Sequence, residues 1–161
     1  MKARHWFIFC ALLSLITQSY AMDRRGRLGA GFTNQLQNGL PAVSFKLQKS
    51  KSFAFGGVFG INTDASSGGS GGGVKFYRNI FEEPQLNFYA SSLIGFISQK
   101  RSAGDQSGFQ VDLTMGSEFS FAGLSSLGFS VEFGVSLNKV DEFVVETVGH
   151  NFIVAGAHFY L

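Results

Sequence analysis

The segment Leu127–Leu137, LGFSVEFGVSL, alternates strictly between two kinds of residue. Its odd positions carry large apolar side chains, and its even positions carry glycine, serine or the single charge of Glu132. Successive side chains of a β-strand point to opposite faces of the sheet, whereas a helix with this pattern would carry apolar groups all around its axis. The alternation therefore predicts a strand with one apolar face and one face of small or charged groups.

The same alternation recurs through most of the chain and predicts an all-β protein with eight strands. The weakest cases are 85–98, where both faces carry apolar groups, and 149–161. Most of the segments reach the roughly 9–11 residues that a tilted strand needs to cross a bilayer. The expected ranges are 27–35, 41–48, 52–62, 72–80, 85–98, 108–119, 125–138 and 149–161.

The links between these segments alternate in length after a modest first link at 36–40. The short links are 49–51, 81–84 and 120–124, and the longer, polar or glycine-rich links are 64–71, 99–107 and 139–148. Short turns at one end and longer loops at the other are typical of outer-membrane barrels. We therefore expect an eight-stranded antiparallel up-and-down transmembrane β-barrel.

The composition excludes several other classes of protein. Of 161 residues, 45% are hydrophobic and only 15% are charged, and the chain holds 21 glycines and 19 phenylalanines. An intrinsically disordered chain would carry few aromatic and many charged residues. A helical bundle would use alanine, leucine, glutamate and lysine in place of glycine and phenylalanine.

Residues 1–21 are predicted to be a secretory signal peptide, which leaves 22–161 as the barrel domain. Lys2 and Arg4 form a positive start, residues 6–16 are apolar, and Ser-Tyr-Ala at 19–21 is a small-residue cleavage pattern. The apolar run is too short to cross a bilayer as a helix. Without the two basic residues of the signal, eleven basic residues balance eleven acidic ones. No charge excess therefore favours nucleic acid as a partner.

Cleavage is expected after Ala21, so that the exported protein begins at Met22. The reason is the order of positive, apolar and small-residue segments before this bond. N-terminal sequencing of the protein from a membrane fraction checks this expectation, and a chain that still begins at Met1 would contradict it.

The chain resembles the small eight-stranded outer-membrane barrels of OmpA/OmpX type. Gly-Val-Lys-Phe-Tyr at 73–77 and Gly-Ser-Glu-Phe at 116–119 look like strand ends of that group. In the family, the last strand ends in an aromatic residue and serves as the signal for the barrel-insertion machinery. Here the chain ends in Phe159-Tyr160-Leu161, with leucine last, and no tryptophan follows residue 21. We expect Phe45, Phe53, Phe119 and Phe159 to replace tryptophan near the short-turn side.

This resemblance implies a monomer in the outer membrane of a Gram-negative bacterium. Its partners would be outer-membrane lipid, lipopolysaccharide and the insertion machinery, together with an unidentified surface ligand. A secreted, soluble, lipocalin-like carrier remains open, because alternation alone does not say which face points inward. A glycine-rich face with few charges, abundant phenylalanine and a chain that ends on its last strand favour the membrane barrel.

The inward positions are expected to form a polar network in the lumen. If the link between the sixth and seventh strands centres near Ala122, Asp112 faces Glu132 and Lys75 joins the two acids. Lys46 is expected lower in the barrel, beside Glu118. His158 is expected to pack in the lumen near the chain end.

The same network is predicted to be structural, and no catalytic, cofactor-binding or metal-binding residue is assigned. Beyond residue 21 the chain has two histidines and no cysteine, too few of the usual ligands for a zinc or iron site. The glycine-rich stretch 68–75 lacks the Lys-Ser/Thr and the helix of a phosphate loop. Arg24, Arg25 and Arg27 either contact anionic groups at the membrane surface or form a solvated N-terminal stub, and the stub is the preferred interpretation.

The expected function is therefore a structural or surface-interaction barrel whose filled lumen is not an open channel. One alternative is a lipid A-modifying enzyme that uses His150 with a nearby acid and a serine. The acids available to it are Asp141, Glu142 and Glu146, and the serines are Ser102 and Ser107. A small pore is the least favoured alternative, because eight strands leave an interior that side chains fill.

Overall fold

The computed structural model describes residues 24–101, 104–149 and 152–161, which form β-strands, turns and loops. The expected signal peptide, with Ala21 and Met22 at its cleavage site, lies outside these residues. None of the described residues forms a helix long and apolar enough to cross a membrane. The strands are β1 Leu28–Thr33, β2 Ala42–Gln48, β3 Phe53–Asn62, β4 Gly69–Glu83, β5 Leu86–Arg101, β6 Gly104–Phe119, β7 Leu127–Lys139, β8 Phe143–Thr147 and β9 Val154–Tyr160.

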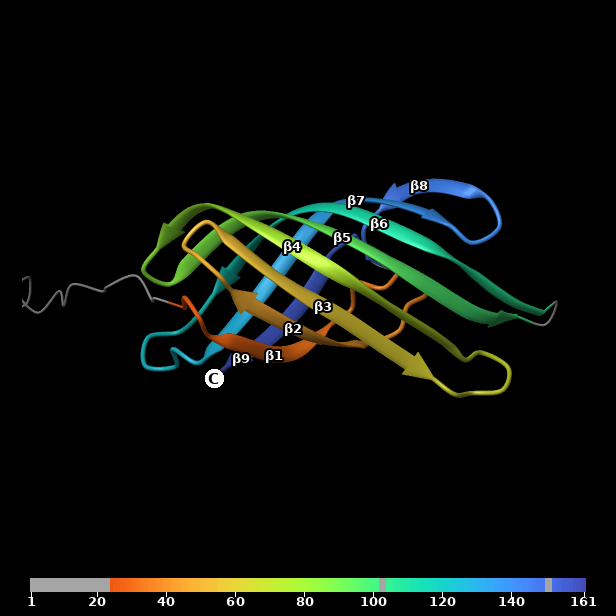
Figure 1. Cartoon of the computed structure of the whole chain (residues 1–161), viewed down its shortest axis with the longest axis horizontal. Helices are drawn as coiled ribbons and strands as arrows, with labels where there is room; N and C mark the ends of the chain where they lie inside the picture. Colours follow the sequence, from red (N-terminus) through yellow and green to blue (C-terminus); the bar gives the residue numbers. More distant parts are fainter. Residues whose placement is uncertain (1–23, 102–103, 150–151) are drawn as a thin grey trace, which may run out of the picture.

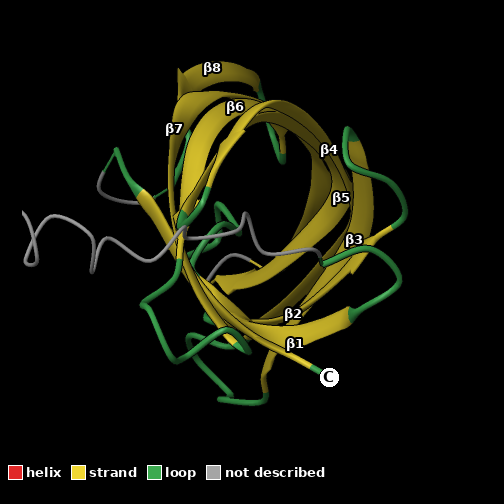
Figure 2. Cartoon of the chain, turned by 90° about the vertical axis from the view of Figure 1, so that its left-hand side faces the viewer, coloured by secondary structure: helices red, strands yellow, loops and turns green. Residues whose placement is uncertain are grey.

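Eight of these strands close into an antiparallel barrel (Figures 1 and 2). Consecutive strands pair from β1 to β7, and β9 then pairs with both β7 and β1. β8 is not part of the ring. It pairs with residues 135–139 of β7, beyond the residues of β7 that pair with β9. The predicted all-β, eight-stranded up-and-down barrel is therefore confirmed as a fold.

Several predicted boundaries are wrong, most of them at the end of the barrel with the longer links. At the other end, β4 continues to Glu83, so most of the expected short link 81–84 is strand. The expected loop 139–148 contains β8, and most of the expected loop 99–107 belongs to a long β5–β6 hairpin with Lys100 opposite Asp105. The last strand begins at Val154 rather than at residue 149. The polar character of these segments reflects exposure beyond the barrel, and it does not interrupt strand pairing.

The end of the glycine-rich loop expected over 64–71 belongs to β4 instead, which begins at Gly69. A Cβ at Gly73 would lie 2.6 Å from the backbone oxygen of Ile94, and one at Gly95 would lie 2.5 Å from the oxygen of Gly72. The two strands approach so closely that a side chain on either would force them apart. Glycine is thus required here by a close backbone approach inside a strand.

The two faces of each strand differ in chemistry and in direction: the large apolar side chains point outward, and the polar side chains point into the lumen. The outward positions hold large apolar side chains, each between 37% and 65% exposed, including Phe32, Val43, Phe45, Phe55, Phe59, Ile61, Val74, Phe76, Ile94, Phe96, Leu113, Met115, Val131, Phe133, Val135 and Phe159. The inward positions hold buried polar groups, including Ser44, Lys46, Lys75, Gln110, Asp112, Thr114, Glu118, Glu132, Ser136 and His158. The barrel is therefore apolar outside and polar inside.

The link between β1 and β2 turns into the lumen. Leu36, 1% exposed, packs in a small apolar cluster with Ala42, Val58, Leu93 and Ile97. Two inward glycines leave room for it: a Cβ at Gly60 would lie 3.0 Å from Leu36 Cδ1, and one at Gly71 would lie 3.1 Å from the same atom. This link is thus anchored in the barrel rather than free at its mouth.

Candidate functional site

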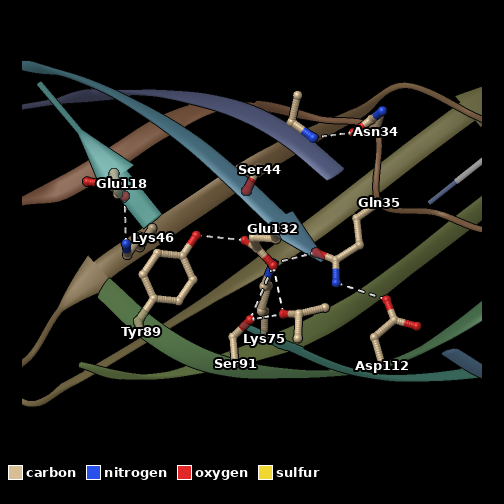
Figure 3. Close-up of polar contacts among 12 residues, drawn as sticks. Asn34, Gln35, Ser44, Lys46, Lys75, Tyr89, Ser91, Asp112, Glu118 and Glu132 are labelled. Atoms are coloured by element: carbon tan, nitrogen blue, oxygen red, sulfur yellow. Dashed lines mark hydrogen bonds and ion pairs between the residues drawn. The ribbon is translucent and has the colours of Figure 1, made fainter. Parts of the chain in front are cut away.

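The candidate site is the polar network in the lumen, which centres on Glu132 of β7 (Figure 3). Lys75 of β4 places its Nζ 2.6 Å from Glu132 Oε2 and 2.7 Å from Oε1. The hydroxyls of Tyr89 and Thr114 each donate to the carboxylate at 2.8 Å. The side chains come from four consecutive strands, β4 to β7, so the carboxylate ties together about half of the barrel wall.

A second carboxylate, Glu118 of β6, holds a similar set nearer the short-turn end. Lys46 Nζ lies 2.6 Å from Glu118 Oε2, and the hydroxyl of Tyr160 donates to both carboxylate oxygens at 2.9 Å. Arg24 forms an ion pair with the same carboxylate. The Lys46 ammonium also lies 4.6 Å from the ring centroid of Tyr77, where a cation–π interaction adds to the ion pair. The structure thus brings Lys46 and Glu118 together.

Asp112 does not face Glu132, so this part of the expected arrangement is wrong. Asp112 pairs with Ser136 in the β6–β7 ladder, and Glu132 pairs with Gly116. The register is displaced because the connection from 120 to 126 folds into two tight turns, which Leu124 and Leu127 close with backbone hydrogen bonds. The ladder therefore centres near Leu124 and not near Ala122.

Lys75 and Asp112 were expected to contact each other directly, but Gln35 connects them instead. Its side-chain oxygen accepts from Lys75 Nζ at 2.5 Å, and its nitrogen donates to Asp112 Oδ2 at 2.9 Å. Gln110 donates to the same Asp112 oxygen at 2.8 Å. Sequence reasoning missed Gln35, although its position continues the inward alternation of β1.

His158 lies in the lumen, as expected, where it contacts Ser44 and forms no ion pair with a carboxylate. Its Nε2 is 2.9 Å from Ser44 Oγ, and both side chains are buried. Its Nδ1 has no hydrogen-bond partner within the described part of the chain. A Ser–His pair without an orienting acid and without access from the surface lacks the arrangement that activates a nucleophile.

The loop residues considered for catalysis are only partly within the described structure. His150 and Ser102 lie outside it. Ser107 donates to Ser98 at 3.0 Å, while Asp141 accepts from Gln106 and Glu146 accepts from Asn138, each at 2.6 Å. In residues 24–101, 104–149 and 152–161, no group of three or more metal-ligating side chains is found.

A hollow of about 430 Å³ opens at the loop end of the barrel. Its floor includes Gln37 and Asn38 of the β1–β2 link, and its sides come from β5 and from the β7–β8 hairpin. Asn38 is fixed there by hydrogen bonds to the backbone oxygens of Ser70 and Ser98. The hollow is therefore a formed surface feature above the polar lumen.

Arg24 and Arg27 are not part of a solvated stub, so that interpretation is wrong for these two residues. Arg24 lies over the ring of Tyr160, 4.3 Å from its centroid, besides its ion pair with Glu118. Arg27 donates to the backbone oxygen of Tyr160 at 3.0 Å and to that of Leu161 at 3.4 Å. The start of the described chain is thus clamped to its end.

Comparison with known proteins supports the fold. No family model and no curated protein matches the chain. The crystal structure of the N-terminal β-barrel domain of Pseudomonas aeruginosa OprF matches with a TM-score of 0.65 and 12% sequence identity. The match covers 85% of this chain and 98% of that domain. The chain therefore has the fold of a small OmpA-type barrel, as its sequence predicted.

Proposed function

We propose that this protein is an outer-membrane β-barrel of a Gram-negative bacterium with a structural or surface-interaction role. The observation that carries the proposal is the outer face, where large apolar side chains such as Phe32, Ile94 and Phe96 are each more than half exposed. An apolar surface of this extent is unfavourable in water and suited to lipid. The closed ring also pairs its backbone groups within the protein, as a bilayer requires.

The polar lumen supports the membrane barrel over a soluble lipocalin-like carrier. A carrier would turn its large apolar side chains inward around a ligand. Here the interior holds ion pairs such as Lys75–Glu132 and Lys46–Glu118. Burial of such charges is tolerated when they are paired and hydrogen-bonded, and both carboxylates have several donors.

A filled lumen without an open channel is the second part of the proposal. Its support is the stack of buried side chains along the axis, from Leu36 near the loop end through Tyr89 to Tyr160 near the turn end. Eight-stranded barrels leave an interior only just wide enough for side chains. Single-channel recordings in planar bilayers should therefore show no steady conductance.

A structural or surface role is also proposed in preference to lipid modification. Asp141 and Glu146 already accept hydrogen bonds from amide side chains, and the buried Ser44–His158 pair lacks an acid. The hollow at the loop end would be the contact surface for a ligand. Lipid A should accordingly have the same structure in cells with and without the protein.

We expect the protein to fractionate with the outer membrane and to be heat-modifiable on gels. Val131→Arg should reduce the folded form, because an arginine on the lipid face near the middle of the bilayer costs about 2–4 kcal/mol. The measurement is the ratio of the folded to the unfolded band in unheated samples of the membrane fraction.

Ala122→Arg provides the matched control, because Ala122 is exposed in the short turn between β6 and β7. It introduces the same side chain outside the apolar belt and should leave the ratio unchanged. Recovery of the wild-type protein in the soluble fraction, or equal behaviour of the two variants, would contradict the proposal.

A further inference from the structure

One side of the barrel wall is much shorter than the other. β1 has 6 residues and β2 has 7, whereas β5 and β6 have 16 each. A tilted strand needs about 9–11 residues to cross a bilayer. The link between β1 and β2 accordingly ends well short of the β3–β4 and β5–β6 hairpins (Figure 1). We call the outer face of β1 and β2 the low wall.

The apolar outer face ends early on the low wall. On β1 it runs from Leu28 to Phe32, four residue steps or about 13 Å along the strand. The next outward position is Asn34, which is exposed and whose Oδ1 accepts from the backbone N–H of Ala155 at 2.7 Å. On β7 the apolar face runs from Leu127 to Leu137, ten steps or about 33 Å.

Strand register shows that this difference lies at the loop end. Phe32 is joined through Ala157 to Phe129 of β7. Because the strands are tilted, the outward residue of β7 at the height of Phe32 is Val131, two positions further along. Above Val131 the outward positions remain apolar as far as Leu137, and Val145 of β8 lies beside Leu137. Above Phe32 the next outward side chain is a polar amide.

The link after Asn34 is fixed at this level and is not free to extend upward. Leu36 is held in its glycine-lined socket, and Gln35 bonds to both Lys75 and Asp112. Asn38 donates to two backbone oxygens across the barrel, Ser70 of β4 and Ser98 of β5. In a bilayer of uniform thickness, the exposed Asn34 side chain would lie in hydrocarbon. Its Oδ1 accepts from the Ala155 N–H, but burial of its amide NH2 group in hydrocarbon would be costly.

We propose that the bilayer is locally thinned beside the low wall, so that lipid headgroups and water of the outer leaflet reach down to Asn34. A bilayer adapts to a short apolar stretch by thinning at a modest cost. The low wall is therefore an interaction surface for lipid with shortened or disordered chains, while β7 on another side keeps the full thickness. This inference rests on the proposed membrane location.

The test uses tryptophan fluorescence, because residues 22–161 contain no tryptophan. Phe32→Trp and Val131→Trp place one fluorophore each at the same height on the two walls. The variants are folded into phosphatidylcholine vesicles that carry bromine either near the headgroup or near the chain end. We expect quenching of Phe32→Trp to shift toward the shallow bromine and that of Val131→Trp to favour the deep one.

Val43→Trp gives a second reading of the low wall, since Val43 is exposed on β2 directly opposite Phe32. It keeps the test decisive if Phe32→Trp does not fold. Equal quenching profiles on both walls would overturn the thinning and leave the membrane location intact. Absence of quenching from every variant would overturn the membrane location itself, and the thinning with it.

Discussion

Lys75→Met should lower the free energy of unfolding of the barrel by about 3–5 kcal/mol, the usual cost of removing one partner from a buried ion pair. Lys75 is 3% exposed and donates to both oxygens of Glu132 and to Gln35. Methionine has a similar length but no donor, so the Glu132 charge would remain buried without its cation. Urea unfolding of the folded barrel in lipid vesicles measures the effect.

Two further variants separate the loss of the cation from other causes. Lys100→Met removes a lysine near the end of the β5–β6 hairpin and should have little effect. The double variant Lys75→Met with Glu132→Gln leaves no buried charge at this position and should recover part of the lost stability. Equal, small effects of Lys75→Met and Lys100→Met would contradict the view that Lys75 lies in a dry, paired environment.

Deletion of Phe159, Tyr160 and Leu161 should largely abolish accumulation of the folded barrel. Tyr160 pairs with Gly29 in the seam that closes the ring, and its hydroxyl donates to Glu118. The deletion would leave β1 with an unpaired edge, which lipid does not tolerate. The amount of heat-modifiable protein in the outer membrane measures the effect.

Substitutions at the same residues separate the seam contacts from a terminal recognition signal. Tyr160→Phe removes only the hydroxyl bond to Glu118 and should reduce stability without preventing insertion. Leu161→Phe introduces the terminal aromatic residue found in the small outer-membrane barrels that this chain resembles, and this variant should insert at least as well as wild type. Normal accumulation of the folded barrel after the three-residue deletion would refute the role of the seam.

The sequence predicted the barrel because alternation determines which side of a strand each residue occupies. The structure places Lys46, Lys75, Glu118 and Glu132 in the lumen, and strand parity alone was sufficient to expect them there. Asp112 also lies inside, but its neighbour was misassigned, because a register depends on the exact form of a turn. The displacement here, from Glu132 to Ser136 as the partner of Asp112, is four residues; an even displacement keeps every side chain on its face and changes every partner.

The features that sequence reasoning missed depend on contacts between distant segments. Leu36 enters the lumen because Gly60 and Gly71, on other strands, leave a space of its shape. Arg24 is held by Glu118 and Tyr160 from the far end of the chain. Neither contact produces a local periodicity. β8 was missed because it spans only five residues, all of them exposed, and its sequence FVVET does not alternate strictly between apolar and polar residues.

The contacts between the two chain ends, such as Arg27 with Tyr160, also determine the order in which the strands of the barrel pair during folding. Arg27 and Tyr160 are 133 positions apart, whereas the β5–β6 and β6–β7 hairpins join near neighbours. Contacts at large sequence separation carry the greatest loop-closure entropy and slow folding. The hairpins can therefore form early, whereas the β1–β9 seam can form only after the last strand has been synthesised. Until then the chain is an open ribbon with two unpaired edges, and this is the stage at which it is most prone to aggregate.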